Sequence, residues 1–223
     1  MTTILLDADF TVFSSAAACQ KTIVWDDEII TRHIDLDEAK RVLSSAISDT
    51  FTLAEADPDS DDIVLCFSCP SRQYLRHAVD PSYKANRKGG HPPLGLRELR
   101  EFATSQWDSR TKPGLEADDV LGILGTDKRI IKGRTIIASV DKDLDQIPGL
   151  HINPNKPDLG VYLVTPLMGQ RQFYYQVLAG DSTDGYPGCP GLGPVRANRV
   201  LDNVPVCDDP WRHVVAAYHK AGL

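Results

Sequence analysis

Acidic side chains stand where two short apolar runs of this chain end. Asp7 follows the run Thr3–Leu6, and Asp141 and Asp143 follow the run Thr135–Val140. Short continuous apolar runs are typical of buried strands, and the carboxyl ends of parallel strands meet at one edge of a sheet. We therefore expect these carboxylates, which come from distant parts of the sequence, to line one cleft.

Two further acidic clusters have a spacing that suits the same cleft. Glu116 and Asp119 are three residues apart on one face of a predicted helix, with Asp118 beside them. The positive end of the helix dipole favours ionised acids in this first turn. Asp181 and Asp184 are three residues apart in a glycine-rich segment. Each cluster alone is also explained by a helix cap or a surface turn, and the joint pattern is what favours a shared site.

Carboxylates gathered in this way need cations. Two unit charges about 4 Å apart repel each other by roughly 4 kcal/mol at an effective dielectric constant near 20. Several such pairs exceed a typical folding stability of about 5–15 kcal/mol unless protons or cations relieve them. Oxygen ligands select hard divalent ions, so we predict two or more Mg²⁺ ions, with Mn²⁺ as a substitute. Two such ions about 3.5–4 Å apart form the arrangement that hydrolyses phosphodiesters.

The charge of the chain is unevenly distributed. The 223 residues carry a formal net charge of −7, but residues 72–112 carry +5 and the remainder −12. A protein divided in this way can hold phosphates with one part and cations with the other, although a solvated basic face gives the same charge. Within the basic segment, Tyr83 stands beside Lys84 and Arg87. We predict that the two cations clamp a scissile phosphate while the ring stacks on a terminal base, the alternative being a solvated loop.

A glycine-rich stretch near the C-terminus has the spacing of a helix–hairpin–helix. Gly191 and Gly193 enclose one leucine, and the helical pattern Pro194–Leu201 follows. Glycines let a backbone approach a phosphate, and a following helix offers its N-terminal amides to the anion. Such contacts hold DNA without reading its bases. A tight turn rich in glycine and proline is the alternative interpretation.

The composition excludes several classes of protein. Hydrophobic residues make up 42% and charged residues 25% of the chain, which is ordinary for a globular protein and not for a disordered or collagen-like one. No apolar run approaches the roughly 20 residues of a membrane span, and the start lacks the pattern of a secretory signal. The five cysteines are scattered and odd in number, which favours a reducing cytoplasm over a disulfide framework.

The elements that must position these residues alternate along the chain. Two more apolar runs, Ile63–Phe67 and Gly160–Val164, are predicted strands. Asp35 followed by Glu38 is typical of a helix start. Further helices are predicted over Leu94–Trp107, Leu115–Leu124, Arg171–Leu178 and Trp211–Lys220. The segment Asp80–Pro93 is predicted to be a mobile or partly helical excursion. Short apolar strands alternating with amphipathic helices indicate an α/β fold with a mostly parallel sheet.

Five ordered stretches together resemble the 5′ nuclease family of flap endonucleases and phage 5′→3′ exonucleases. They are Leu5–Asp9, Asp80–Arg87, Leu115–Val120, Ser139–Asp143 and Gly180–Tyr186, and the glycine-rich hairpin follows in the expected order. The resemblance implies a PIN-like α/β core at residues 1–165, with a helical arch in segment 70–112. It also implies a helix–hairpin–helix region at residues 166–223, packed on the core as one unit, whose hairpin can bind K⁺ together with the duplex backbone.

The resemblance also implies roles for individual residues. The first metal site maps to Asp7, Glu116, Asp118 and Asp119, and the second maps to Asp141, Asp143, Asp181 and Asp184. Lys84 and Arg87 match cations at the base of the arch, and Tyr83 matches a stacking aromatic. The predicted DNA contacts are Arg72, Arg76, Lys88, Gly188, Gly191, Gly193 and Arg196.

One position departs from the family pattern. The family has an aspartate just past the second strand of the core, where this chain has Ser68 and Cys69. Neither side chain is a carboxylate, so we expect a first metal site that is weaker or that relies more on water ligands.

These observations predict a divalent-metal-dependent 5′ nuclease that hydrolyses phosphodiester bonds at or near 5′ ends and 5′ flaps of duplex DNA. Its expected setting is DNA replication, repair or phage DNA metabolism, as a monomer in the cytoplasm of a bacterial or phage-infected cell. A replication polymerase or a single-strand-binding protein is the expected partner. The alternatives are a cleavage-impaired DNA-structure-binding protein and a PIN-type ribonuclease.

Overall fold

The computed structural model describes residues 1–25, 29–71, 73–85, 91–205 and 207–223. The chain divides into two compact units. The first unit comprises residues 1–74, 91–144 and 149–163, and the second comprises residues 75–90, 145–148 and 164–223. Part of the segment expected to form the arch, residues 75–90, is therefore grouped with the C-terminal helices rather than with the core.

A six-stranded sheet forms the centre of the first unit. Its spatial order is β5-β4-β1-β6-β7-β8, and the pairs β5–β4, β4–β1, β1–β6 and β6–β7 are parallel. The strands are β1 (Thr2–Asp7), β4 (Asp62–Phe67), β5 (Asp108–Thr111), β6 (Arg134–Ala138), β7 (Gly149–Ile152) and β8 (Tyr162–Val164). The mostly parallel sheet that the sequence predicted is confirmed.

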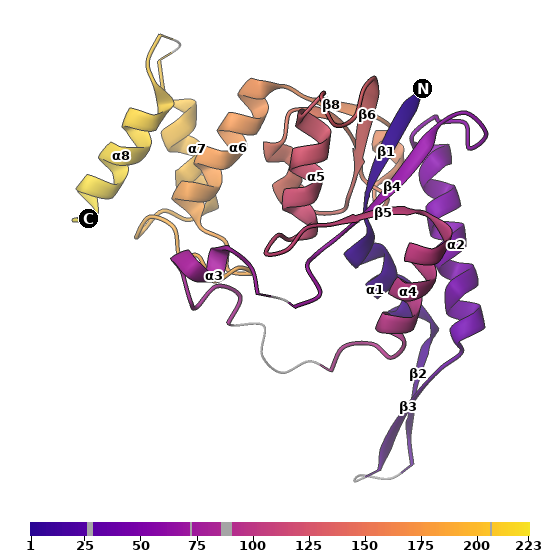
Figure 1. Ribbon diagram of the computed structural model, residues 1–223. Helices are drawn as coiled ribbons and strands as arrows, with labels where there is room; N and C mark the ends of the chain where they lie inside the picture. Colours follow the sequence, from indigo (N-terminus) through magenta and orange to yellow (C-terminus); the bar gives the residue numbers. More distant parts are fainter. Residues whose placement is uncertain (26–28, 72, 86–90, 206) are drawn as a thin grey trace. The chain divides into compact units, whose positions relative to one another are not determined.

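Helices cover both faces of this sheet (Figure 1). The helices α1 (Ala8–Cys19), α2 (Leu36–Leu53) and α4 (Leu96–Gln106) pack against one another on one face, and α5 (Ala117–Thr126) packs on β1 and β4 from the other. Because side chains alternate along a strand, Ile4 and Leu6 of β1 contribute to the core below α1. Leu5 points the other way, toward Gly125 of α5.

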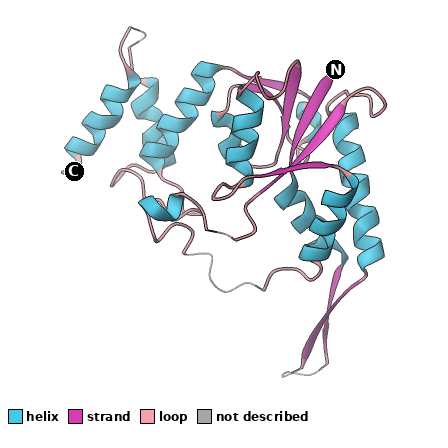
Figure 2. Ribbon diagram, in the orientation of Figure 1, coloured by secondary structure: helices cyan, strands magenta, loops and turns pink. Residues whose placement is uncertain are grey.

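An antiparallel hairpin joins α1 to α2. Its strands are β2 (Gln20–Val24) and β3 (Ile30–Ile34), and they form a separate two-stranded sheet that is visible in Figure 2. The helix α2 then begins at the predicted cap, where Asp35 Oδ1 accepts the N–H groups of Asp37 and Glu38, each at 3.0 Å. The hairpin itself was not predicted from the sequence.

The second unit has its own helices and its own core. Its helices are α3 (Arg76–Val79), α6 (Pro166–Ala179), α7 (Pro194–Asp202) and α8 (Pro210–Lys220). The core is built around Leu178, Ala197 and Val214, which are almost fully buried. Turns follow α3 over residues 81–85. Within the described residues, the excursion predicted at Asp80–Pro93 therefore has a helix only just before its expected start, and residues 86–90 lie outside the described part.

A close backbone contact shapes the loop between α6 and α7. Gly180 and Gly188 both have positive φ, at 77° and 68°. A Cβ at Gly188 would lie 2.7 Å from the carbonyl oxygen of Leu178 and would also meet the backbone nitrogen of Gly180. The two glycines therefore allow the loop to fold back on the end of α6.

Among the described residues, no helix is both long and apolar enough to cross a membrane.

Candidate functional site

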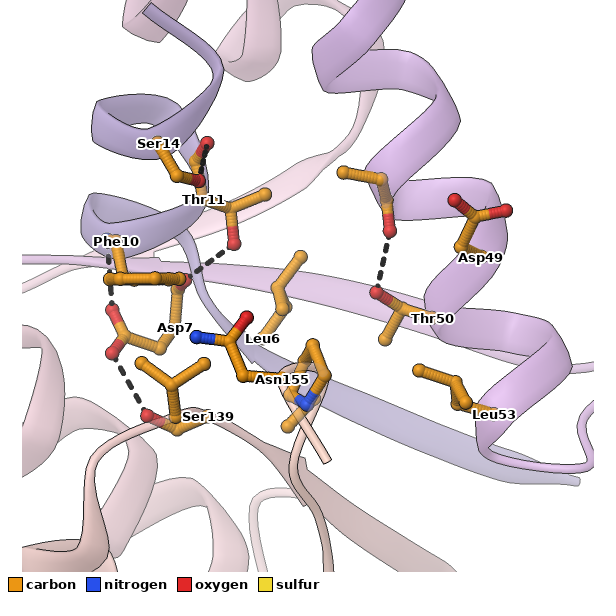
Figure 3. A pocket seen from close by; sticks show the side chains of 14 residues that line it. Leu6, Asp7, Phe10, Thr11, Ser14, Asp49, Thr50, Leu53, Ser139 and Asn155 are labelled. Atoms are coloured by element: carbon orange, nitrogen blue, oxygen red, sulfur yellow. Dashed lines mark hydrogen bonds between the residues drawn. The ribbon is translucent and has the colours of Figure 1, made fainter. Parts of the chain in front are cut away.

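Asp7 lies at the carboxyl end of the central strand and is buried, with 8% of its surface exposed. Its Oδ1 accepts the N–H of Phe10 at 3.4 Å, so the same carboxylate caps α1. Its Oδ2 accepts the hydroxyl of Ser139 at 3.0 Å (Figure 3). Burial is the main reason that the pKa of Asp7 is raised from 3.8 to about 6, and the charges of Asp9 and Asp141 raise it further.

The end of β6 supplies the partner of Asp7. The register of the parallel pair places Leu6 opposite Ala138, so the residues that follow them, Asp7 and Ser139, meet. The Ser139 hydroxyl also accepts the N–H of Asp141 at 3.1 Å, and Asp141 Oδ1 accepts the N–H of Asp143 at 2.8 Å. Sheet topology thus brings Asp7 and Asp141 into electrostatic range, as the sequence predicted. Ser139 was not predicted.

The acids of α5 form its N-terminal cap. The helix begins two residues later than predicted, at Ala117, with Glu116 as the N-cap. A capping box joins Glu116 and Asp119, and the N–H of Glu116 donates to Asp119 Oδ2 at 3.0 Å. Glu116 is 5% exposed, and Asp118 follows it in the first turn. A helix start accounts for these contacts, and their metal-binding role stays a prediction.

Two residues that the sequence did not single out as site residues lie at the end of β4. Asp9 Oδ2 accepts the N–H of Ser68 at 2.8 Å, and Arg100 Nη2 donates to the Ser68 carbonyl at 2.7 Å. The hydroxyl of Ser68 accepts the N–H of Ala117 at 2.9 Å. The pattern Asp7-Ala8-Asp9 gave a weak signal for Asp9, whereas Arg100 had no signal beyond being one of several basic residues.

A cavity of about 210 Å³ opens beside Asp7, between α1, α2 and the loops after β6 and β7 (Figure 3). Its lining includes the side chains of Thr11, Asp49, Ser139 and Asn155. Asp7 therefore borders a space that small polar groups can enter.

In the second unit, Tyr83, Lys84 and Asp184 lie together. Lys84 Nζ lies 3.7 Å from Asp184 Oδ1, and the Tyr83 hydroxyl donates to Asp184 Oδ2 at 3.1 Å. The Lys84 ammonium lies 4.9 Å from the centre of the Tyr83 ring, and the Arg76 guanidinium lies 5.8 Å from it. Lys84 has a φ of +57°, which a residue with a Cβ adopts at an energetic cost and which occurs often at functional sites.

Asp181 organises the loop that carries Asp184. Its backbone pairs with that of Tyr186, and its Oδ1 accepts the N–H groups of Thr183 at 2.7 Å and Asp184 at 3.3 Å. Asp181 and Asp184 are thus near neighbours in the second unit, while the other predicted metal ligands belong to the first unit.

The predicted DNA-binding hairpin has two kinds of glycine. Gly188 is required by packing against Gly180, whereas no heavy atom lies within 4 Å of a Cβ built at Gly191 or Gly193. The Arg196 guanidinium donates to the Gly191 carbonyl at 3.0 Å. Arg72, Arg87 and Lys88, which were also predicted to contact DNA or phosphate, lie outside the described residues.

The donor set of the first unit fits a hard divalent cation. The predicted ligands offer oxygen atoms only, and the buried carboxylate of Asp7 is held near two other negative charges. Within the described residues, no three histidine, cysteine, aspartate or glutamate side chains are already arranged as a metal site. The predicted ligands therefore suit a divalent cation by their oxygen atoms and their charge, and not by a preformed coordination geometry.

The profile of the family described as the 5′-3′ exonuclease, N-terminal resolvase-like domain matches residues 4–161. The chain belongs to this 5′–3′ exonuclease family. Within the family, an exodeoxyribonuclease of Enterobacteria phage T3 is 32% identical over 193 residues, which are 85% of this chain and 63% of the T3 protein. An exonuclease of Escherichia phage T7 is 30% identical over 222 residues, which are 98% of this chain and 72% of the T7 protein. The chain thus spans less than two thirds of the T3 relative.

The fold of this chain is similar to that of a solved phage nuclease. The flap endonuclease of bacteriophage T5, crystallised with DNA and metal ions, matches with a TM-score of 0.60 at 13% identity, covering 100% of this chain and 86% of the T5 chain. The predicted PIN-like α/β core is therefore confirmed. The family match ends before α6, so the helices of the second unit beyond α3 lie outside it.

Proposed function

We propose that this protein hydrolyses phosphodiester bonds at or near 5′ ends and 5′ flaps of duplex DNA and depends on divalent metal ions. The junction of β1 and β6 carries this proposal, because the buried Asp7 carboxylate lies there within range of the charges of Asp9 and Asp141. An oxygen site of this charge suits Mg²⁺, with Mn²⁺ as a substitute. The names of the T3 and T7 relatives and the DNA and metal ions of the T5 complex support the same activity.

Carboxylates of both units are proposed to hold two or more ions. The first site would use Asp7, Glu116, Asp118 and Asp119, and the second Asp141, Asp143, Asp181 and Asp184. When bound, the ions supply the charge that activates a water molecule and stabilises the leaving oxygen. Asp7 and Glu116 are buried and fixed by hydrogen bonds, so these two side chains would set the geometry of the proposed first site.

The basic residues after α3 are proposed to bind the reacting phosphate. Lys84 and Arg87 would contact the scissile phosphate, and Tyr83 would stack on a terminal base. The Asp184 carboxylate contacts both Lys84 and Tyr83. If Asp184 held a cation, the Lys84 ammonium would be available to the phosphate.

The hairpin and its surroundings are proposed to hold the duplex backbone. The open space at Gly191 and Gly193 and the nine-residue helix α7 that follows suit a phosphate at the helix start, with K⁺ as a bridging ion. Arg72, Arg76, Lys88, Gly188 and Arg196 are the other residues that we propose for DNA binding. Gly188 would act indirectly, through the shape of the loop.

We infer a cellular setting from the phage relatives. The protein would act as a monomer in the cytoplasm of a bacterial or phage-infected cell, in DNA replication, repair or phage DNA metabolism. A replication polymerase or single-strand-binding protein is the proposed partner.

A duplex with a labelled 5′ flap tests the proposed function. With Mg²⁺ we expect short products released from the 5′ end, and with EDTA we expect none, because the carboxylates alone cannot activate water. Gel electrophoresis that resolves product length measures both. Binding without cleavage in Mg²⁺ and in Mn²⁺ would indicate a cleavage-impaired DNA-binding protein, which the lack of a carboxylate at Ser68 favours. Equal turnover of single-stranded RNA would indicate a ribonuclease.

Replacing Lys84 with glycine should separate activity from stability. The change removes the ammonium but suits the positive φ, so we expect cleavage to fall by about 10²-fold while the unfolding temperature does not fall. Single-turnover kinetics and thermal unfolding measure the two effects. The matched control is Glu55→Gly, at the other described non-glycine residue with positive φ (52°), and it should leave cleavage unchanged. A K84G variant that cleaves at the wild-type rate would contradict the role of Lys84.

A further inference from the structure

The carboxyl end of β4 is held by contacts that converge on Ser68. Its N–H donates to Asp9 Oδ2 at 2.8 Å, and its carbonyl accepts from Arg100 Nη2 at 2.7 Å. Its hydroxyl accepts the N–H of Ala117 at 2.9 Å. The three polar groups of this one residue are therefore engaged by three helices, α1, α4 and α5.

Arg100 joins several of these contacts through one planar group. Its Nη1 lies 3.6 Å from Asp9 Oδ1, and its guanidinium carbon lies 4.5 Å from the centre of the Phe67 ring. Phe67 is fully buried, and the Arg100 side chain is 26% exposed. The guanidinium thus stacks on Phe67, donates to the carbonyl of Ser68 and forms an ion pair with Asp9 of α1. The fork of an arginine can make these contacts together, whereas an ammonium is a single point of charge.

Ser68 connects this arrangement to the acidic start of α5. Its bond to the Ala117 N–H satisfies one of the amides that a helix start leaves without an intrahelical partner. A second bond runs from the N–H of Cys69 to the carbonyl of Leu115 at 2.9 Å. Residues 68–69 are therefore joined to residues 115–117 on both sides of Glu116, which shares its capping box with Asp119.

We propose that Arg100 is a positioning residue which, together with Asp9, clamps the end of β4 and so holds the acidic start of α5 at the end of the strand that pairs with β1. This inference rests on the proposed function, because it concerns the metal site of that nuclease. Ser68 stands close to where the resemblance predicts an aspartate, and it has no carboxylate to offer an ion. In this chain Ser68 instead links Arg100 to the start of α5, so the placement of Arg100 affects the placement of Glu116 and Asp119. Residues that orient metal ligands commonly affect metal affinity by about 10–100-fold.

Charge and geometry predict opposite effects for changes at Arg100. A cation beside a metal site repels the ions, so charge alone predicts that removing it strengthens metal binding. Loss of the clamp predicts weaker binding. Arg100→Lys keeps the positive charge and removes the forked guanidinium. Any loss of metal affinity in this variant is therefore caused by the lost contacts and not by a change of charge.

The experiment compares wild type, Arg100→Lys and Arg100→Met in the full-length chain. Mn²⁺ binding without DNA is measured by electron paramagnetic resonance of the free ion, and single-turnover cleavage is measured on the 5′-flap duplex. We expect both variants to bind Mn²⁺ about tenfold more weakly and to cleave about tenfold more slowly, with unchanged affinity for the duplex in EDTA. Because Mn²⁺ binding is measured without cleavage, a wild type that fails to cleave would overturn the proposed function and leave the clamp testable.

The matched control is Arg97→Lys, since Arg97 lies on the same helix with 80% of its side chain exposed and pairs with Glu98 and Glu101 of that helix. It should behave as wild type. If R100K binds Mn²⁺ as tightly as the wild type, or if R100M binds it more tightly, the proposed positioning role of Arg100 is overturned. If the Arg100 variants do not fold, Ser68→Ala decides, because it removes only the acceptor for the Ala117 N–H. It should weaken Mn²⁺ binding severalfold, and an unchanged affinity would overturn the proposal.

Discussion

Replacing Asp7 with asparagine should lower cleavage by at least about 10²-fold and at the same time raise the unfolding temperature of the metal-free chain. The loss of activity follows from the loss of a proposed metal ligand at the buried end of β1. The gain in stability follows from removing a buried negative charge, since an asparagine of the same shape can still accept the Phe10 N–H and donate to Ser139.

The pKa of Asp7 gives the size and the pH dependence of this effect. Burial raises that pKa from 3.8 to about 6, so ionised Asp7 costs the folded state roughly 3 kcal/mol at one pKa unit per 1.36 kcal/mol. Between these two values the folded chain binds more protons than the unfolded chain. The contribution of Asp7 to stability is therefore complete below about pH 4 and is lost as the pH rises through about 6. The asparagine variant should lack this pH dependence.

Thermal unfolding in EDTA from pH 4 to 8 measures the stability, and flap cleavage in Mg²⁺ measures the activity. Adding Mg²⁺ should raise the unfolding temperature of the wild type more than that of the variant, because an ion that binds only the folded state stabilises it. Asp49→Asn is the matched control, since Asp49 lines the same cavity from α2 and is exposed. A D7N variant that is less stable than wild type at pH 8 in EDTA would contradict the electrostatic explanation.

Replacing Gly188 with alanine should destabilise the second unit by about 3 kcal/mol and abolish duplex binding. The new Cβ would lie 2.7 Å from both the Leu178 carbonyl oxygen and the Ala179 carbonyl carbon, and it would also meet the Gly180 nitrogen. These are backbone atoms, which cannot move aside as the end of a side chain can. The positive φ of 68° adds a further cost for any residue with a Cβ.

Limited proteolysis followed by mass spectrometry measures this effect, with new cleavage sites expected within residues 164–223, and a gel shift measures duplex binding. Gly185→Ala is the matched control, because it has a similar φ of +79° with no heavy atom within 4 Å of the added Cβ. It should cost only about 1 kcal/mol. Equal protease resistance of G188A and G185A would show that the close contact with Gly180 does not determine stability.

Parts of the molecule with a strong local signal could be predicted from the sequence. Runs such as Ile63–Phe67 are apolar throughout because parallel strands are buried on both faces, and this also placed Asp7 and Asp141 at one edge. Asp35 marks the start of α2 because its side chain caps the helix by accepting hydrogen bonds from the first backbone N–H groups. These signals depend on neighbours in sequence.

Parts that depend on distant neighbours could not be predicted. The helix α1 buries Val12 and Ala16 yet exposes Phe10 and Phe13, so its apolar residues show no single face. The edge strand β5 is polar, with the sequence Asp-Ser-Arg-Thr. Arg100 acquires its contacts only when α4 packs beside the end of β4. The metal-ligand roles of the acids stay predictions, since they depend on ions as well as on the fold.

The central place of β1 affects when the proposed activity can arise during translation. Leu6 lies between Leu65 of one neighbouring strand and Ala138 of the other, and both partners are synthesised long after it. A nascent chain therefore emerges from the ribosome with Asp7 still lacking the Ser139 and Asp141 groups that complete its surroundings. A half-made copy would therefore lack the proposed metal sites. The proposed activity would arise only after synthesis has passed β6, which precedes Ser139 and Asp141, and has then reached Asp181 and Asp184.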